Sequence, residues 1–275
     1  MRKNRLSCLL TGLIVALCCI PGPAQARRTA TADYAGREYA LYTPASVKGA
    51  APLLVVLHGG GGNANWMHRQ LDWDSVADHY GFRIAFLNGT DGKRFFTHKM
   101  RSWNAGNCCG PAAQSNANDN GYISGFIGMM SRQGLADARR VYLMGHSNGA
   151  MMIYRFACTY SDQIAAAVVV SGSVQIEDIC KAPRLPMLHV HGLDDVNVPV
   201  AGGKGIGKFT GDLMMRSVQQ SDDFMKAAGA SVQTILLPNT PHALAIISEN
   251  MEKQTGKTLA ETAAQFFQGK SAAAR

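Results

Sequence analysis

Short apolar or β-branched segments alternate along this chain with segments of helical length, and this alternation restricts its fold more than any other feature. The strand-like segments are 39–43, 53–57, 83–87, 141–144, 167–171, 187–191 and 234–237. The helix-like segments are 71–80, 122–133, 150–160, 213–228 and 257–267. This order predicts an α/β fold with a mainly parallel central sheet and helices on both faces. In such folds ligands bind at the carboxyl ends of the strands, where functional side chains are therefore sought.

The chain has 275 residues, of which 47% are hydrophobic and 17% are charged, values typical of one globular domain with a large core. Its amino terminus resembles an export signal, because basic residues precede an apolar run at 6–20 and small residues follow. We predict a signal peptide at 1–26, cleavage after Ala26, and a single secreted or periplasmic domain at 27–275. The apolar run spans about 15 residues, too few for a stable membrane anchor, which needs about 20.

Charge argues against a nucleic-acid partner. Residues 1–26 contain three basic and no acidic side chains, so the net charge falls from +8 to +5 once they are removed. The remaining basic residues are interspersed with acidic ones and form no dense run. The sequence carries no prediction of an oligomeric state.

Four cysteines follow the predicted signal: Cys108, Cys109, Cys158 and Cys180. An even number in an exported protein predicts two disulfides, for which three pairings are possible. Because adjacent cysteines pair only in an awkward geometry, we expect Cys108 and Cys109 each to reach a distant partner. The spacing does not match a metal-ligand loop.

A candidate nucleophile lies in "GHSNG", residues 145–149, between a strand-like and a helix-like segment. This is where the sharp strand-to-helix turn of an α/β-hydrolase presents its serine, here Ser147. Gly145 and Gly149 would leave room for such a turn. The following helix would point its first amides toward developing negative charge.

An oxyanion hole needs a second loop, and "LLVVLHGGGG" at 53–62 supplies a strand that runs into four glycines. We predict the backbone amides of Asn148 and Gly60 as the two donors. Gly61 is an alternative to Gly60, because the repeated glycines leave the register open.

The acid and base of a catalytic triad should follow the serine in the order Asp or Glu, then His. His242, directly after the last strand-like segment, is the candidate base, and Asp194 and Asp195 are both candidate acids after the strand at 187–191. A metal site formed by His189, His191 and these aspartates is a competing interpretation. No third distant ligand is evident, so we expect neither a metal nor a cofactor.

Several motifs together resemble one family. They are "REYALYTP", "VVLHGGGGN", "GFRIAFLNGT", "WNAGNCCG", "GHSNGAMM" and "HGLDDVNVP". The chain is similar to the secreted esterases that include polyhydroxybutyrate depolymerases and feruloyl esterases, within the α/β-hydrolases. The resemblance implies Ser147 as nucleophile and His242 as base. It also selects Asp195 as the acid, through the arrangement His-Gly-x-x-Asp-x-x-Val-Pro.

The function implied is hydrolysis of carboxylic esters through an acyl-enzyme, without a cofactor. Hydroxyalkanoate esters or oligomers are the first expected substrates, and feruloyl or acetylxylan-type esters the alternative. A catalytically inactive α/β-hydrolase that acts as a binding protein is a further alternative. The chain departs from the family where an acidic pair is usual, because Asn118 precedes Asp119.

Overall fold

The computed structural model describes residues 28–95, 98–207 and 213–272, so the predicted signal peptide lies outside the described residues. An eight-stranded sheet forms the centre of the fold, in the order β1-β2-β4-β3-β7-β8-β9-β12. Its strands are β1 (Arg28–Tyr34), β2 (Arg37–Thr43), β3 (Ala51–Leu57), β4 (Arg83–Leu87), β7 (Ala136–His146), β8 (Ala166–Val170), β9 (Pro186–Gly192) and β12 (Ser231–Leu237).

Six of these strands, from β4 to β12 in the sheet order, run parallel to one another. Only β1 and β2, at one edge, pair in the antiparallel sense. Two small antiparallel pairs lie outside the sheet: β5 (Thr90–Phe95) with β6 (His98–Ser102), and β10 (Gly203–Lys204) with β11 (Met214–Met215). The predicted fold class, a mainly parallel sheet between helices, is therefore confirmed.

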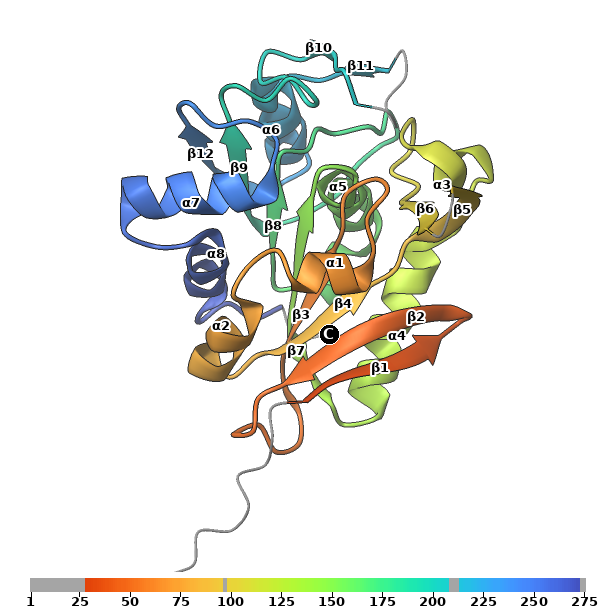
Figure 1. Cartoon of the computed structure of the whole chain (residues 1–275), viewed down its shortest axis with the longest axis vertical. Coiled ribbons are helices and arrows are strands. Elements are labelled where there is room, and N and C mark those ends of the chain that lie inside the picture. The colour runs from red at the N-terminus through yellow and green to blue at the C-terminus, as the bar shows by residue number, and fades with distance from the viewer. Residues whose placement is uncertain (1–27, 96–97, 208–212, 273–275) are drawn as a thin grey trace, which may run out of the picture.

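Helices cover both faces of the sheet. They are α1 (Ala64–His68), α2 (Trp73–Tyr80), α3 (Gly110–Gln114), α4 (Asp119–Arg132), α5 (Asn148–Tyr160), α6 (Val218–Ala227), α7 (Leu244–Thr255) and α8 (Leu259–Phe267), with a short 3₁₀ turn at Ser161–Gln163. In Figure 1, α1, α2 and α7 lie in front of the sheet, and α4, α5 and α6 lie behind it. Since both faces are covered, the central strands are apolar throughout rather than alternating with polar residues.

Alternate residues of each strand supply two separate cores. In β3, Leu53 and Val55 pack with α4 and α5, whereas Leu54 and Val56 pack with α1, α2, α7 and α8. This follows from the two-residue repeat of a strand, in which successive side chains point to opposite faces. The same rule places His189 and His191 of β9 on one face, the one that α5 and α6 cover.

One predicted helix is shorter than expected. The segment at 213–228 begins with strand β11, and α6 starts only at Val218. The reason is local, because the Ser217 side chain accepts from the Gln220 amide while the Gln220 side chain accepts from the Ser217 amide. This reciprocal capping satisfies two amides at the start of a helix and defines that start. Among the described residues, no helix combines the length and apolar composition that crossing a bilayer requires.

Candidate active site

Ser147 occupies a strained turn between β7 and α5. Its backbone has φ 56° and ψ −122°, a positive φ that is rare for a residue with a side chain. Two hydrogen bonds hold this conformation: the Ser147 amide donates to Val170 O (2.9 Å), and its carbonyl accepts from the Met151 amide (3.0 Å). Such strain persists where the surroundings determine it, often at functional sites.

The two glycines of the motif are required by close packing. A Cβ atom on Gly145 would lie 2.6 Å from the carbonyl carbon of Gly149, and one on Gly149 would lie 2.6 Å from His58 O. Neither backbone neighbour can move aside as a flexible side chain would. Glycine at 145 therefore lets β7 pack closely against the start of α5, and glycine at 149 lets α5 approach the end of β3.

The structure brings the predicted acid, base and nucleophile into one hydrogen-bonded row. His242 Nε2 lies 2.9 Å from Ser147 Oγ, and His242 Nδ1 lies 2.7 Å from Asp195 Oδ2. Ser147, Asp195 and His242 follow β7, β9 and β12, parallel strands whose carboxyl ends lie on the same side of the sheet; β8 separates β7 from β9. Asp195 is buried and faces His242, whereas Asp194 is exposed to solvent.

The environment of Asp195 keeps it ionised. Burial by itself would raise its pKa, but hydrogen bonds from His191 and His242 hold the pKa well below its ordinary value. The other oxygen, Oδ1, accepts from the amides of Asn197 and Val198, both at 2.9 Å. A carboxylate that accepts several hydrogen bonds strongly favours its charged form. Asp195 is thus a fixed anion beside His242 Nδ1.

The predicted oxyanion donors are backbone amides of Asn148 and of the glycine loop. The Asn148 amide is the first of α5, one of the amides that a helix leaves without an internal acceptor. The Gly61 amide donates to Arg101 O (2.7 Å), so it is already occupied. No acceptor is found for the Gly60 amide within the described part of the chain. The geometry therefore favours Gly60 over Gly61.

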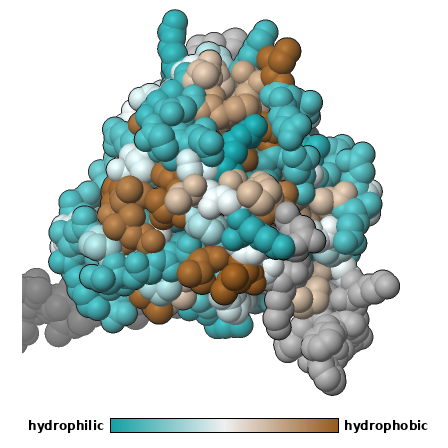
Figure 2. Space-filling view, turned by 90° about the horizontal axis from the view of Figure 1, so that it is seen from above, coloured by the Kyte–Doolittle hydropathy of each residue, from teal (hydrophilic) through white to brown (hydrophobic). Residues whose placement is uncertain are grey.

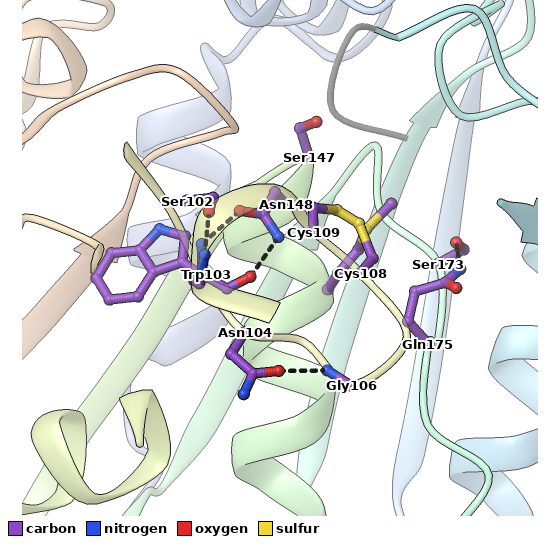
Figure 3. The surroundings of a disulfide bond; sticks show 12 residues. Ser102, Trp103, Asn104, Gly106, Cys108, Cys109, Ser147, Asn148, Ser173 and Gln175 are labelled. Atoms are coloured by element: carbon purple, nitrogen blue, oxygen red, sulfur yellow. Dashed lines mark hydrogen bonds between the residues drawn. A yellow bond between two sulfur atoms is a disulfide. The ribbon is translucent and has the colours of Figure 1, made fainter. Parts of the chain in front are cut away.

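Trp103 connects the two sides of this site, a role that the sequence did not reveal. Its amide donates to Asn148 Oδ1 (2.7 Å), and its carbonyl accepts from Asn148 Nδ2 (2.9 Å), as Figure 3 shows. Its indole Nε1 donates to His58 O (2.9 Å), at the start of the glycine loop. Since Trp103 is fully buried, it acts as a rigid tie between α5 and the glycine loop.

His58 fixes the conformation of the glycine loop. Its Nδ1 lies 2.7 Å from Gly59 O, an acceptor, and its Nε2 accepts from the Gly89 amide at 3.0 Å. Those partners require a neutral ring with the proton on Nδ1. Burial lowers the pKa of His58 to about 4, which keeps the ring neutral.

The role of His146, the second residue of the "GHSNG" motif, was also not apparent from the sequence. Its Nε2 donates to the backbone carbonyl of His242 at 2.9 Å, and the two rings lie 4.8 Å apart between centroids. Burial lowers the pKa of His146 to about 3, so the ring is a neutral donor. Only its position directly before Ser147 could have singled it out from sequence.

The predicted cysteine pairing is wrong for the adjacent residues. Cys108 is bonded to Cys109, as Figure 3 shows, and Cys158 is bonded to Cys180 with their Cα atoms 4.6 Å apart. Cys109 Sγ contacts Met151 Sδ (3.9 Å) in the first turns of α5. Cys158 lies seven residues further along that helix, about 10 Å along its axis. That distance exceeds the reach of a disulfide, about 7 Å between Cα atoms.

The histidines of the competing metal interpretation are arranged differently from metal ligands. His189 and His191 do not converge on one point, because His189 Nε2 lies 3.1 Å from His191 Nδ1 in a direct ring-to-ring contact. Within residues 28–95, 98–207 and 213–272, no group of three or more His, Cys, Asp or Glu side chains is arranged to hold a metal ion.

The family departure at Asn118 has a structural explanation. The Asn118 side chain accepts from the Gly121 amide (2.9 Å) and caps α4, a role that asparagine and aspartate share. Asp119 is fully buried, where it pairs with Arg37 Nη1 (2.6 Å) and accepts from the Asn104 amide (2.7 Å). This buried ion pair anchors the segment next to Trp103.

Apolar side chains are exposed around the loop that carries Asp195. They are Leu193, Val196, Ile206 and Met214, with exposed fractions of 46%, 56%, 74% and 69%. Seen from above, apolar side chains form separate patches among hydrophilic ones (Figure 2). The surface near the carboxyl ends of the strands is thus mixed in character.

Comparison with solved structures places the fold among esterases and related hydrolases. An S-formylglutathione hydrolase from Agrobacterium tumefaciens superimposes with a TM-score of 0.61 at 11% identity, over 87% of this chain and 99% of that one. A carboxylesterase from Bacillus cereus gives 0.55 at 16% identity, over 85% and 94%. At such identities the likeness shows the α/β-hydrolase fold alone.

Curated relatives match the sequence over a little more than half of this chain. A bifunctional acetylxylan esterase/xylanase from Neocallimastix patriciarum is 30% identical over 162 residues, 58% of this chain and 22% of that protein. A feruloyl esterase B from Piromyces equi is 30% identical over 159 residues, 56% and 28%. The chain therefore spans less than a third of the length of these two relatives.

A family model gives the broader assignment. The model is described as esterase PHB depolymerase, and its match begins at β2 and ends at β10. It includes the glycine loop, the turn at Ser147 and the loop that carries Asp195. Because this match, residues 37–203, covers more than half of the chain, the protein belongs to the PHB depolymerase esterase family.

Proposed function

We propose that this protein is a serine carboxylic ester hydrolase that works through an acyl-enzyme. One observation carries the proposal: the unbroken hydrogen-bonded row from Ser147 through His242 to Asp195, with the serine on a strained turn at a helix start. Nucleophile, base and orienting acid in this geometry form the arrangement that recurs in acyl-transfer enzymes.

In the first step His242 Nε2 accepts the proton of Ser147 Oγ as that oxygen attacks the ester carbonyl carbon. The carbonyl π electrons move to the oxygen, and a tetrahedral oxyanion forms. Asp195 holds the imidazole in the tautomer with its proton on Nδ1 and stabilises the imidazolium that results. The oxyanion then re-forms the carbonyl as the bond between that carbon and the alkoxy oxygen breaks. His242 gives its proton to the departing oxygen, so the alcohol leaves and Ser147 remains acylated.

The oxyanion is stabilised by the amides of Asn148 and Gly60. Both are fixed before the substrate arrives, since Trp103 holds Asn148 and the carbonyl of His58 together. Loss of one such donor typically raises the barrier by about 3–4 kcal/mol. In the second step His242 activates water, which cleaves the acyl-enzyme and restores Ser147. The reaction as written needs no cofactor.

The first substrate class we propose is hydroxyalkanoate esters or their oligomers. Membership in the PHB depolymerase esterase family supports it, and so do the apolar side chains exposed beside Asp195. Acetylated or feruloylated plant-wall esters are the second class, supported by relatives named as acetylxylan and feruloyl esterases.

We also propose that the protein is exported. The basic and apolar pattern of residues 1–26 supports export. The two disulfides support it as well, since such bonds persist in oxidising compartments.

Catalytic efficiency on a soluble 3-hydroxybutyrate trimer and on methyl ferulate, measured side by side, tests the proposal, with Ser147→Ala as the blank. Activity well above that blank on the trimer supports hydroxyalkanoate esters as the substrate class. Activity well above the blank on methyl ferulate supports plant-wall esters. Rates equal to the blank on both substrates exclude them. Labelling of the wild-type protein by a fluorophosphonate, and not of Ser147→Ala, then separates an esterase of other specificity from an inactive binding protein.

A further inference from the structure

A second row of buried polar side chains continues from Asp195 away from Ser147. His191 Nε2 lies 3.4 Å from Asp195 Oδ2 and 2.8 Å from Val198 O. His191 Nδ1 lies 3.1 Å from His189 Nε2, and His189 Nδ1 lies 2.7 Å from Asp222 Oδ1. All four titratable residues are at most 3% exposed. The proposed mechanism uses only Asp195.

The hydrogen bonds of this row demand a definite number of protons. Asp222 accepts at one end, so His189 Nδ1 must carry a proton. At the other end Val198 O and Asp195 also accept, so His191 Nε2 must carry one too. The contact between His189 Nε2 and His191 Nδ1 needs a third proton between the rings. Two neutral imidazoles supply only two.

We propose that His189 and His191 share one surplus proton at neutral pH and form a buried cationic pair that positions Asp195. This inference rests on the proposed function for the role of Asp195. The pair places one positive charge between two buried carboxylates, Asp195 and Asp222. Without it, both buried carboxylates would lack this nearby positive charge, and burying a carboxylate is costly unless it is paired and hydrogen-bonded.

Groups from the surrounding elements agree with this charge. Thr234 of β12 donates from Oγ1 to Asp222 Oδ2 (2.5 Å), as expected if Asp222 is ionised. Burial would raise the pKa of Asp222, but the hydrogen bonds from His189 and Thr234 hold it below its ordinary value. The Tyr154 hydroxyl oxygen of α5 lies 3.1 Å from His189 Nδ1. Burial raises the pKa of Tyr154 well above the ordinary value, so this hydroxyl stays neutral.

One effect opposes the charge. Burial lowers the pKa of His189, an effect that the Asp222 carboxylate only partly offsets. Sharing the proton across the ring-to-ring contact moves it toward His191 and the Asp195 carboxylate. Two further titratable groups lie nearby: Lys226 of α6, whose positive charge also helps to lower the pKa of Asp222, and His146 of β7, which stays neutral.

The pair has a consequence for the base. A positive charge on the far side of Asp195 disfavours a second positive charge on His242. His189 and His191 touch neither substrate nor reacting atoms and are positioning residues.

The proton count can be measured without any activity. Spectra from ¹⁵N NMR of the histidine side chains at pH 7 distinguish protonated from unprotonated ring nitrogens. His189→Gln and His191→Gln assign the signals by their loss. We expect three protonated nitrogens among the four of the pair. Two would overturn the proposal.

The pH dependence of kcat/KM tests the effect on the base. For His191→Gln we expect the low-pH side of this profile, its acidic limb, to move to higher pH by about one unit. A shift of this size is expected when a nearby charge is removed at an effective dielectric constant of about 20. His68→Gln is the matched control, because His68 also pairs with a carboxylate, Asp74 Oδ1 at 2.7 Å, on the opposite face of the sheet. In that variant the acidic limb of kcat/KM should stay at the wild-type pH.

If folded His191→Gln has a lower kcat but the acidic limb of kcat/KM stays at the wild-type pH, the electrostatic role of the histidine pair is overturned. If His191→Gln does not fold, His189→Gln removes the same charge and gives the same test. If wild type and Ser147→Ala hydrolyse esters equally, the proposed function fails, and the NMR count alone decides whether the pair is cationic.

Discussion

His146 Nε2 donates a hydrogen bond of 2.9 Å to the backbone carbonyl of His242. The residue before the proposed nucleophile therefore holds the backbone of the proposed base. Only a protonated Nε2 can make this bond, and because burial lowers the pKa of His146 to about 3, the ring is neutral with its proton on Nε2. A change at His146 should affect the position of His242 without removing any group that reacts.

His146→Phe keeps a ring of similar shape but lacks the donor. We expect kcat to fall about tenfold with little change in KM, since a lost hydrogen bond of about 1–1.5 kcal/mol loosens the base. Steady-state kinetics on a soluble ester measure this. His79→Phe makes the same change at an exposed histidine of α2 and should have no effect. Equal kinetics for both variants would contradict the role of His146.

Asp195 and Asp194 offer a matched pair of adjacent carboxylates. Asp195→Asn should lower kcat by about 10⁴, because an amide at this position favours the wrong tautomer of His242. Asp194→Asn should stay close to wild type, since its side chain is exposed and does not reach His242. Equal losses in the two variants would be incompatible with the proposed acid.

Trp103→Phe removes the indole donor to His58 O but leaves both backbone bonds to Asn148. We expect a loss of stability of about 1–3 kcal/mol, because a buried carbonyl loses its partner. We also expect a lower kcat, because the glycine loop shifts. Trp73→Phe is the control, since Trp73 Nε1 makes a similar buried bond to Met67 O (3.1 Å). It should lose stability while kcat stays unchanged, as urea unfolding and kinetics would show.

Buried neutral histidines should make the fold sensitive to acid. Burial lowers the pKa of His58 to about 4, below its ordinary value of 6.5. Between these values the unfolded chain binds a proton that the folded one refuses, so the free energy of unfolding falls as pH drops from 6.5 toward 4. The loss for His58 is about 3 kcal/mol.

Urea unfolding at pH 7.5 and pH 4.5 measures this loss. His58→Gln should be less stable than wild type at pH 7.5 but lose less stability on acidification. The same pH dependence in wild type and His58→Gln would show that His58 does not cause it.

Much of the architecture could be read from the sequence because its causes are local. The strand-like runs at 53–57 and 187–191 lie within β3 and β9, since β-branched and apolar residues favour buried strands wherever they pack. The order of strands and helices then limits the topology, and carboxyl ends of parallel strands meet at one edge. That is why Ser147, Asp195 and His242, far apart in the chain, could be named together.

Other features depend on distances between segments that no local pattern encodes. Cys109 pairs with Cys108 and not with a distant cysteine, and the choice of Gly60 over Gly61 follows from the bond of the Gly61 amide to Arg101 O. The row through His189 and His191 exists only because α6 brings Asp222 against β9.

The sequence by itself therefore determined the order of elements, the turn at Ser147 and the residues of the proposed triad, since periodicity and short-range sterics act within a few residues. The tertiary structure alone decided the disulfide pairing, the hydrogen bonds of Trp103 and the contacts among the buried histidines. Those depend on which atoms meet across the packed interior, where every donor needs an acceptor and each contact is set by the whole fold.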